Sequence, residues 1–432
     1  MSPPAHGGSR GGPRAAAAAL ITALLTLAAR PAAGQTMNSW KGNVATDIVW
    51  SDPGNWTAQV IATTHVAVFS SNAARVYDTT NDLTNLSIMG ILVNNNNTAA
   101  NPVFIRGNAF GITTSGINMS AATTDLTIIT AGLTLAAGQT WTMAAGCTLT
   151  VAAPITGTGS PAMTVTGGGT VRLNAGAAGL GNVSVTGGTL VLGSASATVG
   201  GGTLTVSGTA TLTGVGTIVP NTGTVAGNRV TLGTGTTLAP GIGGVGTLAV
   251  GSAATHGTAE LDGGSKFVVD LGSAVPRPVT GIADVNTNDR LNVTGILQFA
   301  TGTSNLSLAV SGAGQTFVTG QGRTYDYVIA TGSDGLSGFN PAQVTVLPTN
   351  FSVPGTFTVQ AWNTNNVLLS FTPVPEAANV LGACAAAVGM GWWVRFWRRR
   401  WHAAARSPAD RNHDFADSAP VAWTGTPVRA GA

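Results

Sequence analysis

The sequence predicts an all-β protein whose body is a right-handed parallel β-helix, a solenoid of stacked coils. Three observations predict it: one short Gly-Thr-Leu phrase recurs, glycine accounts for 60 of 432 residues, and the middle is nearly uncharged. Between Asp125 and Glu260 the only charged residues are Arg172 and Arg229. A composition rich in β-forming residues and interrupted at short intervals by turn residues such as glycine favours many short strands. An N-terminal cap, a β-rich C-terminal region and a single C-terminal transmembrane helix complete the predicted fold.

The recurring phrase is a glycine followed by an alternating strand of the Thr-Leu type. Copies lie at 169–173, 188–192, 202–206, 208–212 and 246–250, with an earlier version at 148–151. Short strands of this kind also build sandwiches and barrels, but only stacked coils present equivalent positions to equivalent neighbours. We therefore expect coils of roughly 20 residues, with Val, Leu and Ile pointing inward and Thr or Asn stacked outward.

Residues 1–34 are predicted to be a signal peptide. Arg10 and Arg14 give a basic start, 15–29 is an apolar stretch, and the small residues up to Gly34 suit signal peptidase. Cleavage is expected before Gln35. The alternative is a buried helix of a cytosolic domain.

Residues 35–100 are predicted to cap the solenoid. Trp40, Trp50 and Trp56 crowd into this segment, and a first coil needs a cap because it exposes an apolar floor and unpaired strand edges. The alternative is that the three tryptophans form an exposed aromatic platform that stacks on sugar rings.

The solenoid repeats are assigned to 101–256. From 257 to 372 charges return and the strands lengthen. This β-rich C-terminal region is either a set of wider terminal coils or a small separate β-domain, and the sequence leaves both open.

Residues 373–400 have the order of a sorting or anchoring segment. Val374, Pro375 and Glu376 precede eighteen uncharged residues at 377–394, and a basic cluster follows at Arg395, Arg398, Arg399 and Arg400. An apolar span of this length can just cross a bilayer, with the arginines on the cytoplasmic side. Residues 401–432 are expected to be a disordered basic tail.

Two parts of the chain resemble known families. The phrases at 187–192 and 201–206 resemble the autotransporter-associated β-strand repeat, and the ending at 374–400 resembles the PEP-CTERM sorting signal. The second resemblance implies recognition around Pro375 and Glu376 by an exosortase-type membrane protease. It also implies delivery to the cell envelope, outer surface or extracellular matrix, beside exopolysaccharide. The alternative is a C-terminal membrane anchor that is never cut.

The composition argues against nucleic-acid binding and against catalysis. From 35 to 376 the chain has nine Lys/Arg and thirteen Asp/Glu and no basic stripe. The repeat region offers no pair of carboxylates for acid and base work. The segment 284–289 departs from a calcium loop and is interpreted as a surface turn, and the glycines of 241–246 as another turn. We predict no catalytic residue, no cofactor and no metal site.

The sequence therefore predicts an exported bacterial surface or matrix protein of structural or adhesin-like type, and not an enzyme. Expected partners are signal peptidase, the exosortase-type protease, and exopolysaccharide or copies of the protein itself, with membrane contact through the C-terminal helix before processing. Two alternatives stay open: a carbohydrate-binding or polysaccharide-degrading β-helix, and an uncleaved membrane-anchored surface stalk.

Overall fold

The computed structural model describes residues 35–42, 48–70, 77–94, 102–220, 229–276, 287–300, 304–318, 323–374 and 377–404. The predicted signal peptide, Pro375, Glu376 and residues 405–432 lie outside this part of the chain, and in the C-terminal helix side chains are described for 387–400. The described residues belong to two compact units, one holding the strands and the other the C-terminal helix.

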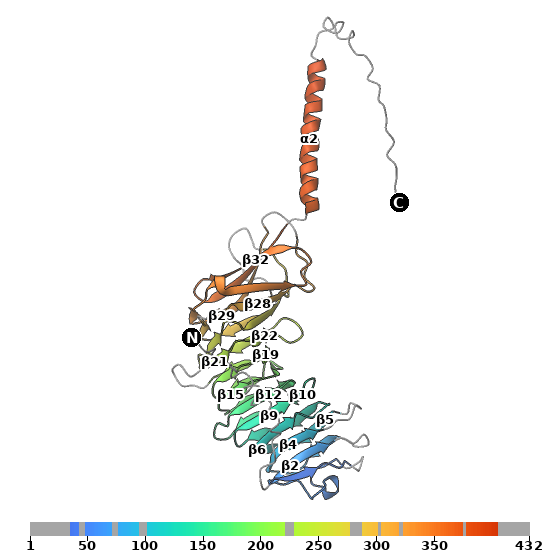
Figure 1. Cartoon of the computed structure of the whole chain (residues 1–432), viewed down its shortest axis with the longest axis vertical. Coiled ribbons are helices and arrows are strands. Elements are labelled where there is room, and N and C mark those ends of the chain that lie inside the picture. The colour runs from blue at the N-terminus through green and yellow to red at the C-terminus, as the bar shows by residue number, and fades with distance from the viewer. Residues whose placement is uncertain are drawn as a thin grey trace, which may run out of the picture. The chain divides into compact units, whose positions relative to one another are not determined.

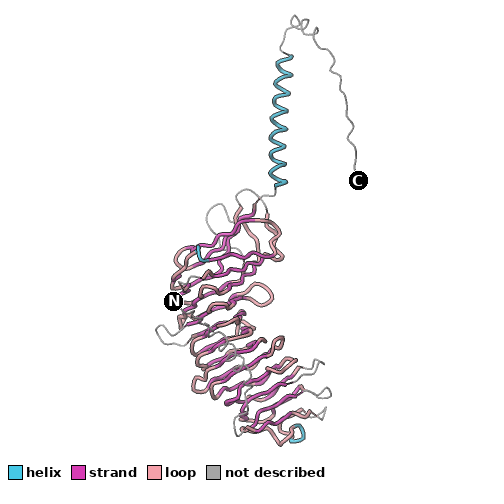
Figure 2. The backbone as a smooth tube through the Cα atoms, in the orientation of Figure 1, coloured by secondary structure: helices cyan, strands magenta, loops and turns pink. Residues whose placement is uncertain are grey.

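The strand unit is a three-sided solenoid in which a typical coil gives one strand to each of three parallel stacks. Figures 1 and 2 show strands of successive coils lying side by side. The first stack is one eleven-stranded sheet. Its members are β3 (Asp78–Asn81), β5 (Val103–Gly107), β7 (Leu126–Thr130), β10 (Thr148–Val151), β13 (Thr170–Leu173), β16 (Thr189–Leu192), β19 (Thr211–Gly214), β22 (Thr237–Pro240), β25 (Lys266–Asp270), β28 (Leu306–Ser311) and β31 (Val344–Thr349).

The second and third stacks belong to one larger sheet. The second contains β8 (Leu133–Leu135), β11 (Ile155–Gly157), β14 (Ala177–Ala178), β17 (Thr198–Gly200), β20 (Thr217–Val219), β23 (Thr247–Val250), β26 (Arg290–Val293) and β29 (Tyr325–Gly332). The third contains β9 (Gln139–Met143), β12 (Met163–Gly167), β15 (Val183–Val185), β18 (Leu204–Val206), β21 (Arg229–Leu232), β24 (Thr258–Leu261), β27 (Ile296–Phe299) and β30 (Gly335–Ser337).

The two stacks merge at the N-terminal end, because the strands there are long enough to turn a corner. The long strands are β4 (Leu86–Asn94) and β6 (Phe110–Met119), and the shorter β1 (Thr36–Ser39) and β2 (His65–Ser70) continue the same sheet. The start of β6 pairs with β8 and its end pairs with β9. The β4–β6 register shifts between Ile88 and Gly90, which is where the strands bend from one face to the other.

Most copies of the recurring phrase form strands as predicted, but in the copy at 208–212 a turn takes up the first residues and only Thr211 and Leu212 belong to β19. Thr148 pairs with Thr170, and Thr170 pairs with Thr189, giving coils of about 22 and 19 residues. The phrase is not restricted to one face, however. Copies at 202–206 and 246–250 form β18 and β23, in the third and second stacks. The same sequence phrase therefore forms strands on all three faces, because side chains alternate inward and outward in the same way on each face.

The core is a set of apolar columns along the inside of the coils. In the first stack Leu149, Val171, Leu190 and Leu212 follow one another in register, and all four are fully buried. Burial of each such side chain contributes roughly 1.5–3 kcal/mol relative to exposure. Since each column continues through neighbouring coils, one continuous core cluster connects the Trp-rich start to the β-rich end.

The question left open over 257–372 is answered by the strand pairing. Parallel pairing continues without a break through β25, β28 and β31 in the first stack and through β27 and β30 in the third. Only the last strands turn antiparallel: β33 (Asn366–Pro373) pairs with β29 and with β32 (Gly355–Trp362). The region consists of wider terminal coils, closed by a short antiparallel sheet within the same unit.

Two short 3₁₀ turns and one helix complete the described elements. The turns are η1 (Pro53–Asn55) and η2 (Pro341–Gln343), and the helix is α2 (Ala377–Ala404). Over the residues whose side chains are described, no helix combines the length and apolar character needed to cross a membrane. The predicted transmembrane helix at 377–394 is thus not supported by the described residues. The right-handed coil stays a prediction, while the parallel solenoid is confirmed.

Candidate functional site

The three tryptophans of the N-terminal segment are core residues. Trp40, Trp50 and Trp56 are each at most 1% exposed, and their rings meet edge to face, with Trp56 centroids 5.0 Å from Trp40 and 5.6 Å from Trp50. The indole Nε1 of Trp56 donates to the carbonyl of Trp50 at 3.0 Å, and that of Trp50 to Thr79 Oγ1 at 3.0 Å. The alternative of an exposed sugar-stacking platform is therefore wrong for these residues, because no ring face is open to a ligand.

The sorting motif is described only at its start. Val374 follows β33 directly and is 47% exposed, whereas Pro375 and Glu376 lie outside the described residues. The basic cluster lies on α2, where Arg395, Arg398, Arg399 and Arg400 are exposed. The guanidinium carbon of Arg400 lies 5.5 Å from the centroid of the Phe396 ring, which is cation–π distance.

Carboxylates of the C-terminal coils are built into the framework. Asp289 is 2% exposed and accepts the backbone N–H of Gly246 at 2.7 Å and that of Asp270 at 3.0 Å. Burial raises the pKa of Asp289 to about 6, although both hydrogen bonds favour the ionised form. A carboxylate with this pKa could act as an acid or a base. Asp289 is buried, however, and its two hydrogen bonds tie the backbone at Gly246 to the backbone at Asp270.

Glu260, another carboxylate of the C-terminal coils, is also paired within the stack. Glu260 forms an ion pair with Arg229 on the neighbouring strand, with Nη1 to Oε2 at 2.6 Å. Burial raises the pKa of Asp262, helped by the adjacent Glu260 charge and opposed by Arg229. Over the described ranges, no group of three or more His, Cys, Asp or Glu side chains could hold a metal ion. Residues 284–286 of the candidate calcium segment lie outside those ranges.

His65 and Cys147 are buried and held by the fold. The Nδ1 of His65 accepts the backbone N–H of Ala62 at 3.0 Å, and burial lowers the pKa of the ring. Cys147 is 4% exposed and its thiol lies 3.3 Å from the carbonyl of Ala122. Burial, with the Asp125 charge, raises the pKa of this thiol, which makes it a poor nucleophile in the native state.

The outer faces carry rows of hydroxyl side chains in register. On the third stack, one row consists of Thr140, Thr164, Ser184, Thr205 and Thr231, which pair strand by strand. We call it the hydroxyl row. Parallel strands lie about 4.8 Å apart, so neighbouring hydroxyls in the row repeat at that spacing. A parallel row on the first stack contains Thr148, Thr170, Thr189, Thr211 and Thr237.

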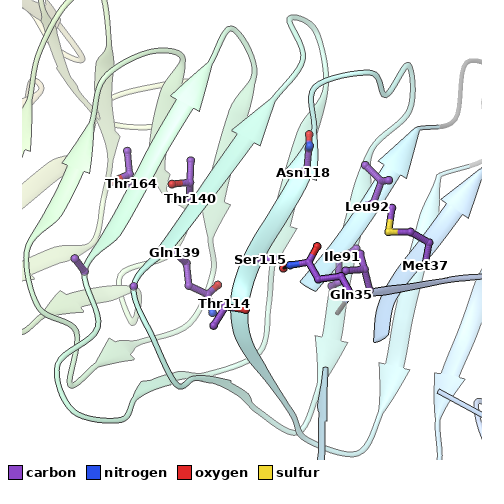
Figure 3. A pocket seen from close by; sticks show the side chains of 13 residues that line it. Gln35, Met37, Ile91, Leu92, Thr114, Ser115, Asn118, Gln139, Thr140 and Thr164 are labelled. Atoms are coloured by element: carbon purple, nitrogen blue, oxygen red, sulfur yellow. Dashed lines mark hydrogen bonds between the residues drawn. The ribbon is translucent and has the colours of Figure 1, made fainter. Parts of the chain in front are cut away.

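A groove interrupts the outer surface where the hydroxyl row reaches the N-terminal coils. It has a volume of about 570 Å³ and lies over β1, β2, β4, β6, β9 and β12. Figure 3 shows its side chains arranged around an open space, with Thr140 and Thr164 on one side and Leu92 and Met37 on the other. The side chains that face it are amides, hydroxyls and apolar groups: Gln35, Met37, Leu92, Thr114, Ser115, Asn118, Thr140 and Thr164.

Two glycines lie in the sheet next to the residues that line the groove. Gly90 pairs with Gly116 across β4 and β6, in the outward row that continues as Thr140 and Thr164. A Cβ on Gly116 would lie 2.2 Å from the carbonyl oxygen of Thr140, and the residue has a φ of +65° that side-chain-bearing residues rarely adopt. A Cβ on Gly90 would lie 2.6 Å from the carbonyl oxygen of Gly116. Both positions must therefore stay glycine for β4, β6 and β9 to pair closely.

One hydrogen bond links Gln35, which precedes β1, to Ser115 of β6 at the groove. The amide Nε2 of Gln35 donates to Ser115 Oγ at 2.6 Å. Gln139 is committed inside the wall, since its Nε2 donates to the carbonyl of Ile112 at 2.8 Å and its Oε1 accepts from Trp141 Nε1 at 3.1 Å. The Oδ1 of Asn118 accepts the N–H of Ser120 at 2.9 Å, which directs Nδ2 elsewhere.

Sequence reasoning did not single out the residues of the groove. The available signal was an isolated glycine inside each of two strands, a pattern that indicates a bulge or a close approach. Against 60 glycines in the chain that signal does not stand out. Comparison with known proteins adds no assignment to this geometry: no protein-family model matches the chain, and no curated protein matches it.

Proposed function

We propose that the protein is an exported structural or adhesin-like component of the cell surface or extracellular matrix. One observation carries the proposal: coil after coil pairs in parallel register from β1 to β31 and displays rows of uncharged side chains on its outer faces. A body of this kind is stiff because its backbone polar groups are paired with those of neighbouring coils. Its flat, weakly charged faces suit contact with polysaccharide or with copies of the protein itself.

The two ends of the chain supply the proposed route. Signal peptidase removes 1–34, and an exosortase-type membrane protease acts around Pro375 and Glu376, upstream of the basic cluster that begins at Arg395. The exposure of Val374, directly after the last strand of the body, supports access by a protease. Cleavage there releases the solenoid without cutting any of its coils.

The proposal is tested by mass spectrometry of both ends of the protein, combined with fractionation of the cells that make it. We expect a first residue of Gln35, an end close to Glu376, and recovery in the envelope or matrix. Recovery in the cytoplasm with Met1 in place contradicts export. An exported chain that keeps Arg398 and Arg399 instead favours the anchored stalk.

A further inference from the structure

We infer that the groove between Gln35 and Thr164 binds an uncharged glycan, through hydroxyl and amide side chains on its walls and an apolar patch at one end. The inference rests on the proposed function in one respect: an exported protein meets such a glycan outside the cytoplasm.

The size and construction of the groove fit a small-ligand site. Its volume of about 570 Å³ falls within the range of ordinary ligand sites. The groove is lined by strands of several paired coils, from β1 to β12, so its shape is set by the packed sheet. Thr140 and Thr164 lie on one side of the groove and Leu92 and Met37 on the other, with Ser115 and Asn118 of β6 between them.

The polar groups of the walls are available to a ligand. In the described part of the chain, the hydroxyls of Thr114, Thr140 and Thr164 and the Nδ2 of Asn118 take part in no hydrogen bond. A hydroxyl both donates and accepts, and Nδ2 donates. Sugar hydroxyls have the same double character, so one sugar ring can meet several of these groups at once. Met37, 41% exposed, and Leu92 offer soft apolar contact to the C–H face of a ring.

The lining also argues against other classes of ligand. Among the described residues that line the groove there is no Lys, Arg, Asp or Glu. An anionic polymer would lose hydration against them without an opposite charge in return, and a nucleic acid would find no cation there for its phosphates. An extended peptide usually binds by adding a strand to a free sheet edge. The groove floor is a sheet face whose strands β4 and β6 are already paired with each other.

The test uses the protein purified from the cells that make it, titrated with cellohexaose, laminarihexaose and maltohexaose as uncharged probes and with hexagalacturonate as the charged probe. Binding is measured by saturation-transfer NMR and calorimetry. We expect at least one uncharged hexasaccharide to bind and hexagalacturonate not to bind. Failure of all three uncharged probes at millimolar concentration, or preference for the charged one, overturns the inference.

Two variants fill the groove from opposite sides, and one matched variant controls for surface change. Thr140→Trp and Thr114→Trp each place a large side chain in the groove, while Thr205→Trp changes an exposed threonine of the same hydroxyl row outside it. We expect each filling variant to weaken binding about tenfold or more and Thr205→Trp to change it less than about twofold. Equal loss in all three would assign binding to the hydroxyl row and not to the groove.

The two proposals can fail separately. A protein that is exported and processed at both ends but binds none of the uncharged probes keeps the proposed function and loses the groove. A protein that binds cellohexaose through Thr140 but stays in the cytoplasm keeps the groove and loses the surface role.

Discussion

His65 and Asn38 are joined on the inside of the first coil: the amide Nδ2 of Asn38 lies 3.2 Å from Nδ1 of His65. That amide also donates to the carbonyl of Gln59 at 2.7 Å, while Asn38 Oδ1 accepts the N–H of Ala58 at 3.0 Å. Asn38 therefore presents donors to the ring, as does the N–H of Ala62. Nδ1 of His65 must be an acceptor, which places the proton of the neutral ring on Nε2.

Acid should loosen the first coil through His65. Burial lowers the pKa of His65 in the folded state below the ordinary 6.5. Between that lowered pKa and 6.5, the unfolded chain therefore binds more protons than the folded one. Stability contributed by the neutral ring is complete above pH 6.5 and declines as the pH falls from 6.5 toward the folded pKa. Hydrogen exchange of the β1 and β2 amides, followed at a series of pH values, measures this loss of stability. His65→Gln keeps an acceptor oxygen and should remove the pH dependence; an unchanged profile would exclude His65 as its source.

Asp289 should act in the opposite direction. Its folded pKa of about 6 exceeds the ordinary 3.8, so the folded state binds more protons between these values. The stability associated with the protonated carboxyl is complete below pH 3.8 and is lost as the pH rises through about 6, by roughly 3 kcal/mol in total. Comparing the pH dependence of urea unfolding in the wild type and in Asp289→Asn isolates this contribution. The same slope in both proteins between pH 4 and 6 would contradict it.

Removing a ring from the tryptophan cluster should destabilise the N-terminal coils. Trp56→Ala deletes contacts with Trp40 and Trp50 and a hydrogen bond to the carbonyl of Trp50, and we expect a cost of about 3–5 kcal/mol. Because each coil contacts mainly its neighbours, the loss should be concentrated in β1, β2 and β4. Amide exchange of these strands measures it. Trp362→Ala, in the half-buried edge strand β32, is the control and should leave them unchanged.

Cys147 should report on opening of the middle coils. Its thiol is buried and has a raised pKa, so alkylation by iodoacetamide should be slow in the native protein and fast in urea. A Cys384→Ala background leaves one reactive position to follow. Rapid native labelling would show that the coils around β7 and β10 open readily.

Much of the fold could be predicted from the sequence because solenoid coils are local and repetitive. The Thr148 and Thr170 copies of the phrase fall in register because each coil meets a neighbour of similar length and pattern. The later coils could not be predicted as easily: Lys266 pairs with Ser307, a coil of about 41 residues, and no local pattern fixes where so long a loop returns.

The groove and the tryptophan cluster illustrate why sites are harder to predict than strands. Whether Trp56 faces solvent or the core depends on the path of the loop that carries it, and composition alone fits both interpretations. The groove needs Met37, Leu92, Ser115 and Thr140 to be brought together from four different strands. These residues lie on different coils, so their alignment is a property of register that no single stretch of sequence contains.

The in-register pairing of Thr148 with Thr170, and of Thr170 with Thr189, also has a consequence for how the gene can change in length. A stretch that starts at one threonine and stops before the next begins and finishes at equivalent points on the coil, so its gene segment can be copied or deleted in frame while the flanking turns still meet. Length is then a trait that unequal recombination can adjust without redesigning either terminus.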